Sequence, residues 1–308
     1  MNREIGIIGL GKMGNGIVRR LLQKGWTVHG IDAFPSTTRE LATVGMKSAT
    51  SPQALVQQLA EPRLVWLMVP AGKPVDEVLF GTHGIAKKLA KGDTIIDGGN
   101  SFYKDSIRRT KELKTMGITF VDVGFSGGPK GAREGGCLMI GGEERTFRTL
   151  EPLFRDLAIQ DGYRFFPGAG AGHFVKMVHN GIEYGMMQSI AEGFAIMKKS
   201  KYKLPLARVA GIYNKGSVIE SRLVGWMKTA FEEYGENLVS ISSMVGHSGE
   251  GEWTAKTARE LKVPAKIIEE SYKFRVQSAK TPSYTGKLVS ALRGQFGGHK
   301  VSASGRKK

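Results

Sequence analysis

The pattern of apolar positions near the N-terminus switches between strand and helix periods. Residues Glu4 to Leu10 form an apolar, β-branched run that predicts a buried strand. A glycine-rich turn follows, after which apolar residues from Ile17 to Leu22 recur at helical spacing. A second strand-like run, Thr27 to Ile31, ends at Asp32. The chain is therefore predicted to begin as strand, glycine turn, helix and strand.

Similar runs continue this alternation over the first half of the chain. The strand-like runs are Leu64 to Val69, Thr94 to Ile96, Thr119 to Val123 and Cys137 to Ile140, with helical patterns at Pro74 to Phe80 and Tyr103 to Met116. Strands that alternate with helices are typical of an α/β fold with a doubly wound sheet. Ligands of such sheets bind beyond the carboxyl ends of the strands, so the loops that begin at Pro70, Gly98 and Phe125 are expected to line one crevice.

The second half has a different pattern, because strand-like runs disappear and helical spacing extends from His173 to about Gly297. The sequence thus predicts that the doubly wound sheet is followed by an all-α C-terminal domain. We expect the boundary near Gly168, with domains at residues 1–168 and 169–300. Residues 301–308 are expected to be a flexible basic tail.

The turn after the first strand has the spacing that binds a dinucleotide. It consists of Gly9, Leu10, Gly11, Lys12, Met13 and Gly14. Between a strand and a helix, such glycines let the backbone approach a pyrophosphate at the helix N-terminus. The N-terminal domain is therefore expected to be Rossmann-like and to bind NAD or NADP.

Asp32 indicates which of the two dinucleotides is bound. A carboxylate at the end of the second strand accepts hydrogen bonds from the adenosine ribose and repels a 2′-phosphate, which favours NAD over NADP. The alternative is that Asp32 only begins the following turn. A phosphate would then be received by Thr37, Thr38 and Arg39.

Composition narrows the class of protein further. With 308 residues and 41% hydrophobic content, the chain can bury a sizeable core, and no apolar run reaches the roughly 20 residues that span a bilayer. We therefore expect a cytoplasmic protein without a membrane partner. The net charge of +17 attracts phosphorylated metabolites and nucleic acids alike, but no zinc finger or reading helix is recognisable, so a nucleic-acid partner is not expected. The single cysteine, Cys137, is expected to be buried, and no histidine or cysteine spacing predicts a metal site.

One helical segment of the second half places four polar groups on one face. They are Lys176, His179, Asn180 and Glu183, at positions i, i+3, i+4 and i+7. A solvent-exposed polar stripe is the ordinary meaning of such a pattern. However, Gly181, Gly185 and Gly193 interrupt the same helix, and each costs about 1 kcal/mol relative to alanine. We therefore expect another element to approach this helix closely.

Seven segments, in order along nearly the whole chain, resemble the 6-phosphogluconate dehydrogenases of the short type with a single helical domain. They are GLGKMG from Gly9, LMVPAG from Leu67, DGGNS from Asp97, FSGG from Phe125 with GAR from Gly131, KMVHNGIEY from Lys176, GEWT from Gly251 and QFGGH from Gln295. This resemblance implies oxidative decarboxylation of 6-phosphogluconate to ribulose 5-phosphate and CO2 in the pentose phosphate pathway, with reduction of NAD or, less favoured, NADP.

The resemblance also implies catalytic roles. Lys176 would act as general base on the C3 hydroxyl, and its ammonium would then polarise the resulting ketone while CO2 leaves. Glu183 would protonate C1 of the enediol. An ammonium in this role replaces the metal ion of other β-decarboxylases, so no metal is expected.

The binding residues that the resemblance implies fall into three groups. The substrate carboxylate and hydroxyls would be held by Asn100, Ser126, Gly127, Gly128, His179 and Asn180. The phosphate would be received by Tyr184, Thr254, Arg275, Arg293 and His299, although without the resemblance the two arginines would be taken for surface charges. Besides the glycine turn and Asp32, the cofactor would contact Val69, Pro70, Ala71 and Asn100.

Two further consequences concern assembly and phosphate recognition. In related enzymes the C-terminal segment reaches into the neighbouring subunit's site, so a homo-oligomer, either dimer or tetramer, is implied. Glu252 departs from the long-form family, which has a phosphate-contacting lysine before its Trp-Thr pair. Either Glu252 points away and Lys256 or another cation replaces that lysine, or the distal group of the substrate differs.

Two alternatives remain open on the sequence alone. A β-hydroxyacid dehydrogenase of the 3-hydroxyisobutyrate type shares the glycine turn, the Ser-Gly-Gly loop and the lysine helix but releases no CO2. Glu183, Arg293 and His299 argue against it. A basic nucleotide-binding or RNA-binding protein without turnover would explain the charge, but not the polar face that contains Lys176 and Glu183.

Overall fold

The computed structural model describes residues 2–298 and 301. The chain divides into two compact units, Met1–Met177 and Val178–Lys308, and each is described by itself. The division falls inside the long helix α8 (Ala171–Lys199). The boundary expected near Gly168 falls a few residues earlier, between the last strand and the start of α8.

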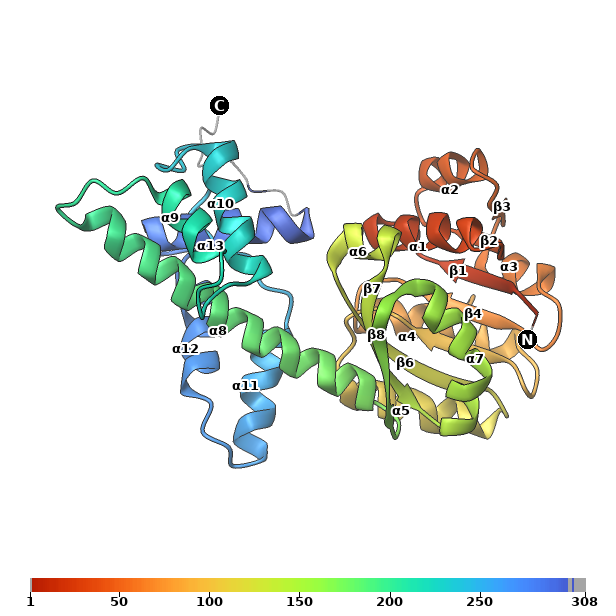
Figure 1. Ribbon diagram of the computed structural model, residues 1–308. Coiled ribbons are helices and arrows are strands. Elements are labelled where there is room, and N and C mark those ends of the chain that lie inside the picture. Colours follow the sequence, from red (N-terminus) through yellow and green to blue (C-terminus); the bar gives the residue numbers. More distant parts are fainter. Residues whose placement is uncertain (1, 299–300, 302–308) are drawn as a thin grey trace. The chain divides into compact units, whose positions relative to one another are not determined.

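Within residues 2–298, the N-terminal unit is built on one eight-stranded sheet (Figure 1). Its strands are β1 (Glu4–Ile8), β2 (Thr27–Ile31), β3 (Lys47–Ser48), β4 (Leu64–Leu67), β5 (Thr94–Asp97), β6 (Thr119–Ser126), β7 (Gly136–Gly142) and β8 (Ala158–Pro167). They lie in the order β3-β2-β1-β4-β5-β6-β7-β8. All neighbours are parallel except β6 and β7. The strand order reverses between β1 and β4, which is where ligands bind in sheets of this kind.

Helices lie between the strands. They are α1 (Lys12–Gln23), α2 (Pro35–Ala42), α3 (Pro52–Gln58), α4 (Lys73–Phe80), η1 (Ala86–Lys88), α5 (Tyr103–Thr115), α6 (Gly128–Glu134) and α7 (Glu144–Leu157). Alternate residues of β4 enter two separate cores, since Trp66 belongs to one cluster and Val65 and Leu67 belong to the other. Both faces of the sheet are therefore buried, which explains why its parallel strands have continuous apolar sequences.

The α/β architecture predicted from the sequence is confirmed, and all six predicted strands are present. Two strands were not predicted: the two-residue β3 and the edge strand β8, whose residues are mostly exposed or half-buried. The expectation for Cys137 is wrong, because its side chain is exposed. Leu138 and Ile140 face the core, and the two-residue period of β7 directs Cys137 to the opposite side.

The second unit is helical over its described residues. It contains most of α8 together with α9 (Leu206–Tyr213), α10 (Arg222–Tyr234), α11 (Glu250–Glu260), α12 (Lys266–Gln277) and α13 (Tyr284–Gly297). Its core joins Phe194 of α8, Phe231 of α10 and Leu288 of α13, all almost fully buried. No helix within residues 2–298 is long and apolar enough to cross a membrane.

Candidate active site

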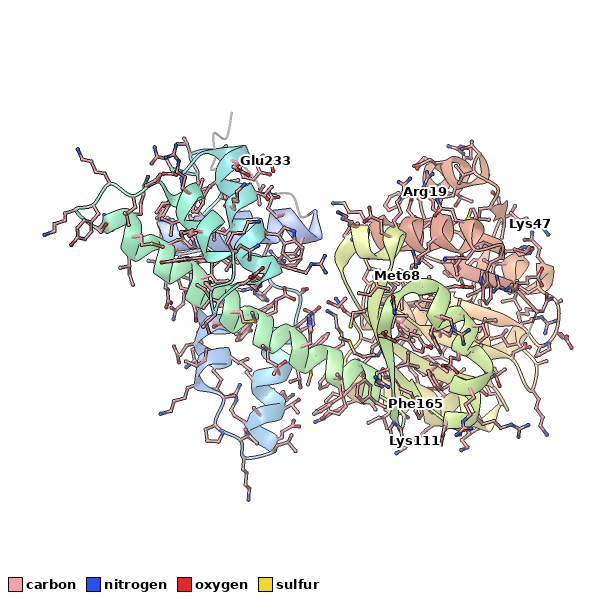
Figure 2. The ribbon with its side chains drawn as sticks, viewed as in Figure 1. Arg19, Lys47, Met68, Lys111, Phe165 and Glu233 are labelled. Carbon is pink, nitrogen blue, oxygen red and sulfur yellow. The ribbon has the colours of Figure 1, made fainter. Side chains whose placement is uncertain are left out.

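The glycine turn between β1 and α1 leaves its backbone open at one position. A Cβ atom on Gly9, whose φ is +96°, would lie 2.3 Å from the carbonyl oxygen of Met68, a residue labelled in Figure 2. A Cβ on Gly14 would lie 2.1 Å from the carbonyl oxygen of Gly9. A Cβ on Gly11, in contrast, would have no described atom within 4 Å. Gly9 and Gly14 are thus required by close packing, whereas Gly11 leaves room for a ligand at the N-terminus of α1, as a bound pyrophosphate requires.

Asp32 is fixed at the end of β2 by backbone hydrogen bonds. Its carboxylate accepts the N–H of Leu10 at 2.6 Å and the N–H of Phe34 at 2.8 Å. The side chain of Leu10 is buried in the core, so only its backbone faces the turn. Thr38 is also buried, and its hydroxyl accepts the N–H of Asp32 at 3.1 Å. This arrangement weakens the alternative in which Thr38 receives a phosphate.

The loop after β5 presents one exposed polar side chain on a fixed backbone. Asp97 is fully buried and accepts the Ser101 hydroxyl at 2.7 Å and the N–H of Gly99 at 3.1 Å. A Cβ on Gly98 would lie 2.3 Å from Nε1 of Trp66, so the loop runs close to β4. Asn100 lies between these anchors and is exposed. The loop therefore displays Asn100 at the carboxyl edge of the sheet, as predicted.

The loop after β4 contains Val69, Pro70 and Ala71 and ends at Gly72, the residue before α4. Arg109 of α5 was not singled out from the sequence, yet it is fully buried against this loop. Its Nη2 donates to the carbonyl oxygen of Gly72 at 3.0 Å. The signal that could have identified it is a basic residue on the helix that follows the loop of Asp97.

Lys176 occupies a slot formed by glycines. The side chain is 6% exposed, so the polar face of α8 is not a simple solvent stripe at this point. A Cβ on Gly124 of β6 would lie 2.3 Å from the Cβ of Lys176. A Cβ on Gly172 would lie 2.4 Å from the carbonyl oxygen of Met139 in β7. The first turns of α8 therefore pack directly on strand backbones, which fixes the stem of Lys176.

Asp122 of β6 anchors the same helix by its N-terminus. Its buried carboxylate accepts the N–H of Gly170 at 2.7 Å and the N–H of His173 at 2.8 Å. Negative charge at this end is favoured by the helix dipole. The imidazole Nδ1 of His173, which received no role from the sequence, lies 2.7 Å from the Ser106 hydroxyl oxygen. Asp122 and His173 thus hold α8 in place one turn before Lys176.

The predicted Ser-Gly-Gly loop is shorter than expected. Phe125 and Ser126 are the last residues of β6, Gly127 with φ +126° forms the turn, and Gly128 with φ +62° is already the first residue of α6. Both values lie in the region that favours glycine. A Cβ on Gly127 would also lie 3.1 Å from the Cα of Gly131. Ser126 is half-buried at the carboxyl edge of the sheet, two strands from the loop of Val69.

The other members of the polar face of α8 belong to the helical unit. The Nδ1 of His179 lies 2.9 Å from Oδ1 of Asn180 and 3.9 Å from Oε2 of Glu183. The side chains of His179 and Glu183 are 37% and 22% exposed. Both are therefore accessible to a ligand.

Tyr184, Arg275 and Arg293 form a cationic cluster in the helical unit, in which Tyr184 and Arg275 are buried and Arg293 is half-buried. The Arg275 guanidinium carbon lies 3.3 Å from the centroid of the Tyr184 ring. Burial lowers the pKa of Arg275 to about 10, so the group stays charged at neutral pH, and burial also lowers the pKa of Arg293. Burial raises the pKa of Tyr184. The two arginines are thus not the surface charges that the sequence by itself indicated.

Thr254 and the glycines of α8 explain how this cluster packs. A Cβ on Gly181 would lie 2.6 Å from Cγ2 of Thr254, and one on Gly185 would lie 3.2 Å from Cγ2 of Ile267. The predicted close approach is therefore confirmed at these two glycines. It is wrong for Gly193, where a Cβ would have no described atom within 4 Å.

Glu252 and His299 are the two remaining residues that the sequence analysis singled out for phosphate recognition. Glu252 is exposed on α11. Burial raises the pKa of Tyr272, and the negative charge of Glu252 and its hydrogen bond with the Tyr272 hydroxyl raise it further. Glu252 is thus engaged by Tyr272. His299 lies outside the described residues.

Both units match models of a known protein family. Residues 4–164 match the NAD-binding domain of 6-phosphogluconate dehydrogenase, and residues 172–285 match the C-terminal domain of the same enzyme. The chain belongs to the 6-phosphogluconate dehydrogenase family. The family assignment inferred from the sequence is therefore confirmed.

Relatives within this family are similar over nearly the whole chain. YqeC of Bacillus subtilis, provisionally named a 6-phosphogluconate dehydrogenase, is 43% identical over 296 residues, which cover 96% of this chain and 98% of the relative. The NAD(+)-dependent, decarboxylating 6-phosphogluconate dehydrogenase of Haloferax volcanii is 37% identical over 300 residues, with 97% and 98% covered. The chain is thus comparable in length to these family members.

A solved structure of the family has the same fold. The 6-phosphogluconate dehydrogenase of Plasmodium falciparum, determined without ligands, with NADP+ and with 6-phosphogluconate, superposes with a TM-score of 0.82 at 30% identity. The match covers 90% of this chain and 62% of that longer chain. The chain thus spans somewhat less than two thirds of the length of that solved structure.

Proposed function

We propose that this protein catalyses the oxidative decarboxylation of 6-phosphogluconate to ribulose 5-phosphate and CO2, with NAD as the preferred electron acceptor. The observation that carries the proposal is the burial of Lys176 in a slot of glycines at the carboxyl edge of the sheet. Burial of a lysine side chain is unfavourable, so it indicates that the amine acts on a bound molecule or pairs with an anion. The family relationship identifies the molecule as a sugar acid.

The cofactor assignment rests on the glycine turn and Asp32. NAD would accept a hydride from C3 of the sugar acid when it is bound. The open space beside Gly11 fits its pyrophosphate, and Asp32 would accept hydrogen bonds from the adenosine ribose. Lys12, Met13 and Gly14 would surround the pyrophosphate with backbone from the first turn of α1. NADP is the less favoured alternative, because Asp32 would repel its 2′-phosphate.

Lys176 would serve two consecutive steps. As a neutral amine it takes the proton of the C3 hydroxyl, and as an ammonium it then donates a hydrogen bond to the new C3 carbonyl. That hydrogen bond stabilises the negative charge that develops on the oxygen as the C1–C2 bond breaks and CO2 leaves. Because the slot at Gly124 restricts the stem of Lys176, little orientation entropy is lost in these steps.

Glu183 would complete the reaction from the same helix. It lies seven residues after Lys176 on α8, which is a rise of about 10 Å along the helix axis. Its carboxyl would protonate C1 of the enediol. Its partial exposure lets solvent restore that proton, and His179 beside it would orient a substrate hydroxyl.

The remaining substrate contacts follow from charge and position. Ser126, Gly127, Gly128 and Asn100 would hold the carboxylate and nearby hydroxyls, and Asn180 would assist His179. The phosphate would be bound by Arg275 and Arg293 with Tyr184 and Thr254, because guanidinium groups match phosphate oxygens in bidentate fashion. The positive charges of the buried Arg275 and the half-buried Arg293 in the helical unit support this assignment. His299 is proposed for the same site.

We further propose that the protein acts in the cytoplasm as a homo-oligomer, a dimer or tetramer, in which the C-terminal segment completes the neighbour's site. The support is the apolar surface of the helical unit. Ile182 and Met186 of α8 are 53% and 44% exposed, and Ile267 of α12, which lies against Gly185, is 68% exposed. Apolar side chains that gather on a surface commonly mark an interface.

The deciding experiment follows NADH and NADPH formation spectrophotometrically with 6-phosphogluconate, together with a CO2 assay and a Lys176→Met variant. We expect NADH and CO2 in equal amounts, a preference for NAD, and loss of turnover by at least about 10³-fold in the variant. NADH without CO2 would indicate a β-hydroxyacid dehydrogenase instead. No turnover with either cofactor would overturn the substrate assignment.

A further inference from the structure

Arg109 is a buried charge for which the proposed reaction has no use. It lies on α5 among the fully buried large side chains of the N-terminal unit. A buried charge is strongly unfavourable unless nearby groups compensate it. The position of those groups therefore indicates what Arg109 does.

The first set of partners belongs to the loop after β4. Nη2 donates to the carbonyl oxygen of Gly72 at 3.0 Å, and Nε donates to Oδ1 of Asp76 at 2.8 Å. Gly72 is the residue before α4 and has φ +81°, and Asp76 lies in the first turn of that helix. Arg109 thus fixes the carboxyl end of the segment that contains Val69, Pro70 and Ala71.

The second set of partners belongs to the loop after β5. Nη1 of Arg109 lies 3.5 Å from Oδ2 of Asp97, which is itself buried. The same carboxylate accepts the Ser101 hydroxyl and the N–H of Gly99, on both sides of Asn100. Because a guanidinium is planar and rigid, one side chain sets the spacing between the two loops.

The sheet order assigns these loops to one half of the dinucleotide. The glycine turn after β1 suits the pyrophosphate, and Asp32 at the end of β2 suits the adenosine ribose. The other half must then extend from β1 in the opposite direction. The strands on that side are β4 and β5, and their loops are the two that Arg109 joins. The nicotinamide half would therefore rest on backbone that Arg109 positions.

We infer that Arg109 is a positioning residue that sets the affinity for the nicotinamide half of the dinucleotide and leaves the affinity for the adenosine half unchanged. The inference rests on the proposed function, because it requires that a nicotinamide dinucleotide binds along this edge of the sheet. It assigns to Arg109 no contact with the cofactor. Its effect passes through Gly72 and Asp97.

The chain offers a matched control in the preceding residue. Arg108 donates to both oxygens of Asp76 at 2.8 Å, so it shares one partner with Arg109. Its side chain is 48% exposed, and its other ion pairs are with Asp105 and Glu112 of α5 itself. Replacement of Arg108 therefore removes a charge and a salt bridge to Asp76 without touching Gly72 or Asp97.

The test measures binding of NADH and of ADP-ribose, which lacks the nicotinamide, to the full chain by isothermal titration calorimetry. In Arg109→Lys we expect NADH affinity to fall about tenfold or more, while ADP-ribose affinity stays within about twofold of wild type. In Arg108→Met both affinities stay within about twofold, because an exposed ion pair contributes little. Thermal melting of each variant reports whether the fold is retained.

Equal losses for NADH and ADP-ribose in Arg109→Lys would overturn the inference, since they would indicate a general structural defect. Unchanged NADH affinity would overturn it too. If the Arg109 variant does not fold, Ser101→Ala takes its place, because it frees one side of Asp97 without removing a charge. It should weaken NADH binding about threefold and leave ADP-ribose binding unchanged, and an unchanged NADH affinity there would overturn the inference.

The proposed function can fail separately. Wild-type protein that binds NADH and ADP-ribose but does not oxidise 6-phosphogluconate would contradict the substrate assignment alone. Wild-type protein that binds neither ligand would overturn the proposed function and, with it, the role of Arg109.

Discussion

The two units differ in how completely they cover their apolar side chains. Among the described residues, four large apolar side chains are exposed in the N-terminal unit, whereas thirteen are exposed in the smaller helical unit. Examples are Val218, Val239 and Ile267, which are 105%, 72% and 68% exposed. The N-terminal sheet is covered by helices on both faces, but the helical unit has apolar side chains on surfaces that nothing in its own fold covers. The difference is what the proposed homo-oligomer requires, in which another subunit would cover the apolar surface of the helical unit.

Charged substitutions on the exposed apolar surface of the helical unit should have the largest effect, because they would dissociate the proposed oligomer. Ile182→Asp together with Ile267→Asp would place carboxylates in an apolar interface, and in a symmetric dimer each occurs twice. An unpaired charge there costs several kcal/mol, so the dissociation constant of the oligomer should rise about 10³-fold or more. Sedimentation at micromolar concentration measures this change. Binding of NADH by the N-terminal unit should remain.

The exposed apolar residues of the N-terminal unit provide the control for this prediction. Phe34→Asp or Met116→Asp places a carboxylate at an exposed apolar residue of the N-terminal unit instead. The Met116→Asp variant should leave the oligomer intact. If the double variant sediments like wild type, the exposed apolar surface of α8 and α12 is not the interface. An interface between subunits would then not explain why the helical unit exposes more apolar side chains than the N-terminal unit.

The slot for Lys176 provides the second prediction, this time in the N-terminal unit. In Gly124→Ala the new methyl group would lie 2.3 Å from the Cβ of Lys176 and 2.8 Å from its Cγ, so the lysine must move. A displacement of about 1 Å at a catalytic group lowers kcat about 10²-fold. Steady-state kinetics with 6-phosphogluconate measure this loss, and NADH affinity should remain within about twofold of wild type.

Gly11→Ala should give the opposite result. Its Cβ would meet no described atom within 4 Å, so the melting temperature should not change. The methyl group would occupy the space proposed for the pyrophosphate, and NADH affinity should fall. If both glycine variants lose NADH affinity equally, the separation of binding at Gly11 from positioning at Gly124 is incorrect.

The local features of both units could be predicted from sequence, and the features that depend on tertiary pairing could not. The runs Leu64 to Val69 and Thr119 to Val123 were recognisable because a parallel sheet buries both faces of its strands. The glycine turn is also local, since its spacing is set by a strand and the helix next to it. Strand β8 was missed because it lies at the edge of the sheet, where Asp161 and Arg164 interrupt the apolar pattern.

The site shows the same division. Gly124 makes room for Lys176 because α8 packs directly on β6. The spacing of residues along the chain does not predict this packing. The burial of Arg275 depends on Tyr184, from a helix ninety-one positions earlier, and sequence alone indicated a surface charge. The exposed Cys137 shows that a small apolar residue type does not decide which face of a strand it occupies.

Substitution in the cationic cluster tests phosphate binding by the helical unit, with a smaller expected effect than the substitutions above. Arg275→Lys keeps the charge but loses the planar fork that matches a phosphate, so KM for 6-phosphogluconate should rise about tenfold with KM for NAD unchanged. Arg259→Lys is the control, because Arg259 is 69% exposed and pairs with Glu269 at 3.6 Å. A rise in both KM values would indicate a general change in the protein rather than a lost phosphate contact.

The smallest expected effect concerns Asp76, which belongs to the N-terminal unit. Burial alone would raise its pKa, but hydrogen bonds from Arg109 and Arg108 outweigh burial, and the pKa is lowered. A carboxyl whose pKa is lower in the folded state stabilises the protein above its unfolded pKa, near 4, and loses that contribution as pH falls through the folded value. Asp76→Asn should therefore lower the free energy of unfolding by about 1 kcal/mol at pH 7, and the difference from wild type should shrink toward pH 3. Urea unfolding at both pH values measures this difference. Glu77→Gln is the control, because the Glu77 carboxylate is 59% exposed and lies 3.8 Å from the ammonium of Lys73. A difference that does not depend on pH would mean that Asp76 acts through packing, and the ion pairs that tie α4 to α5 would not contribute to the stability of the N-terminal unit.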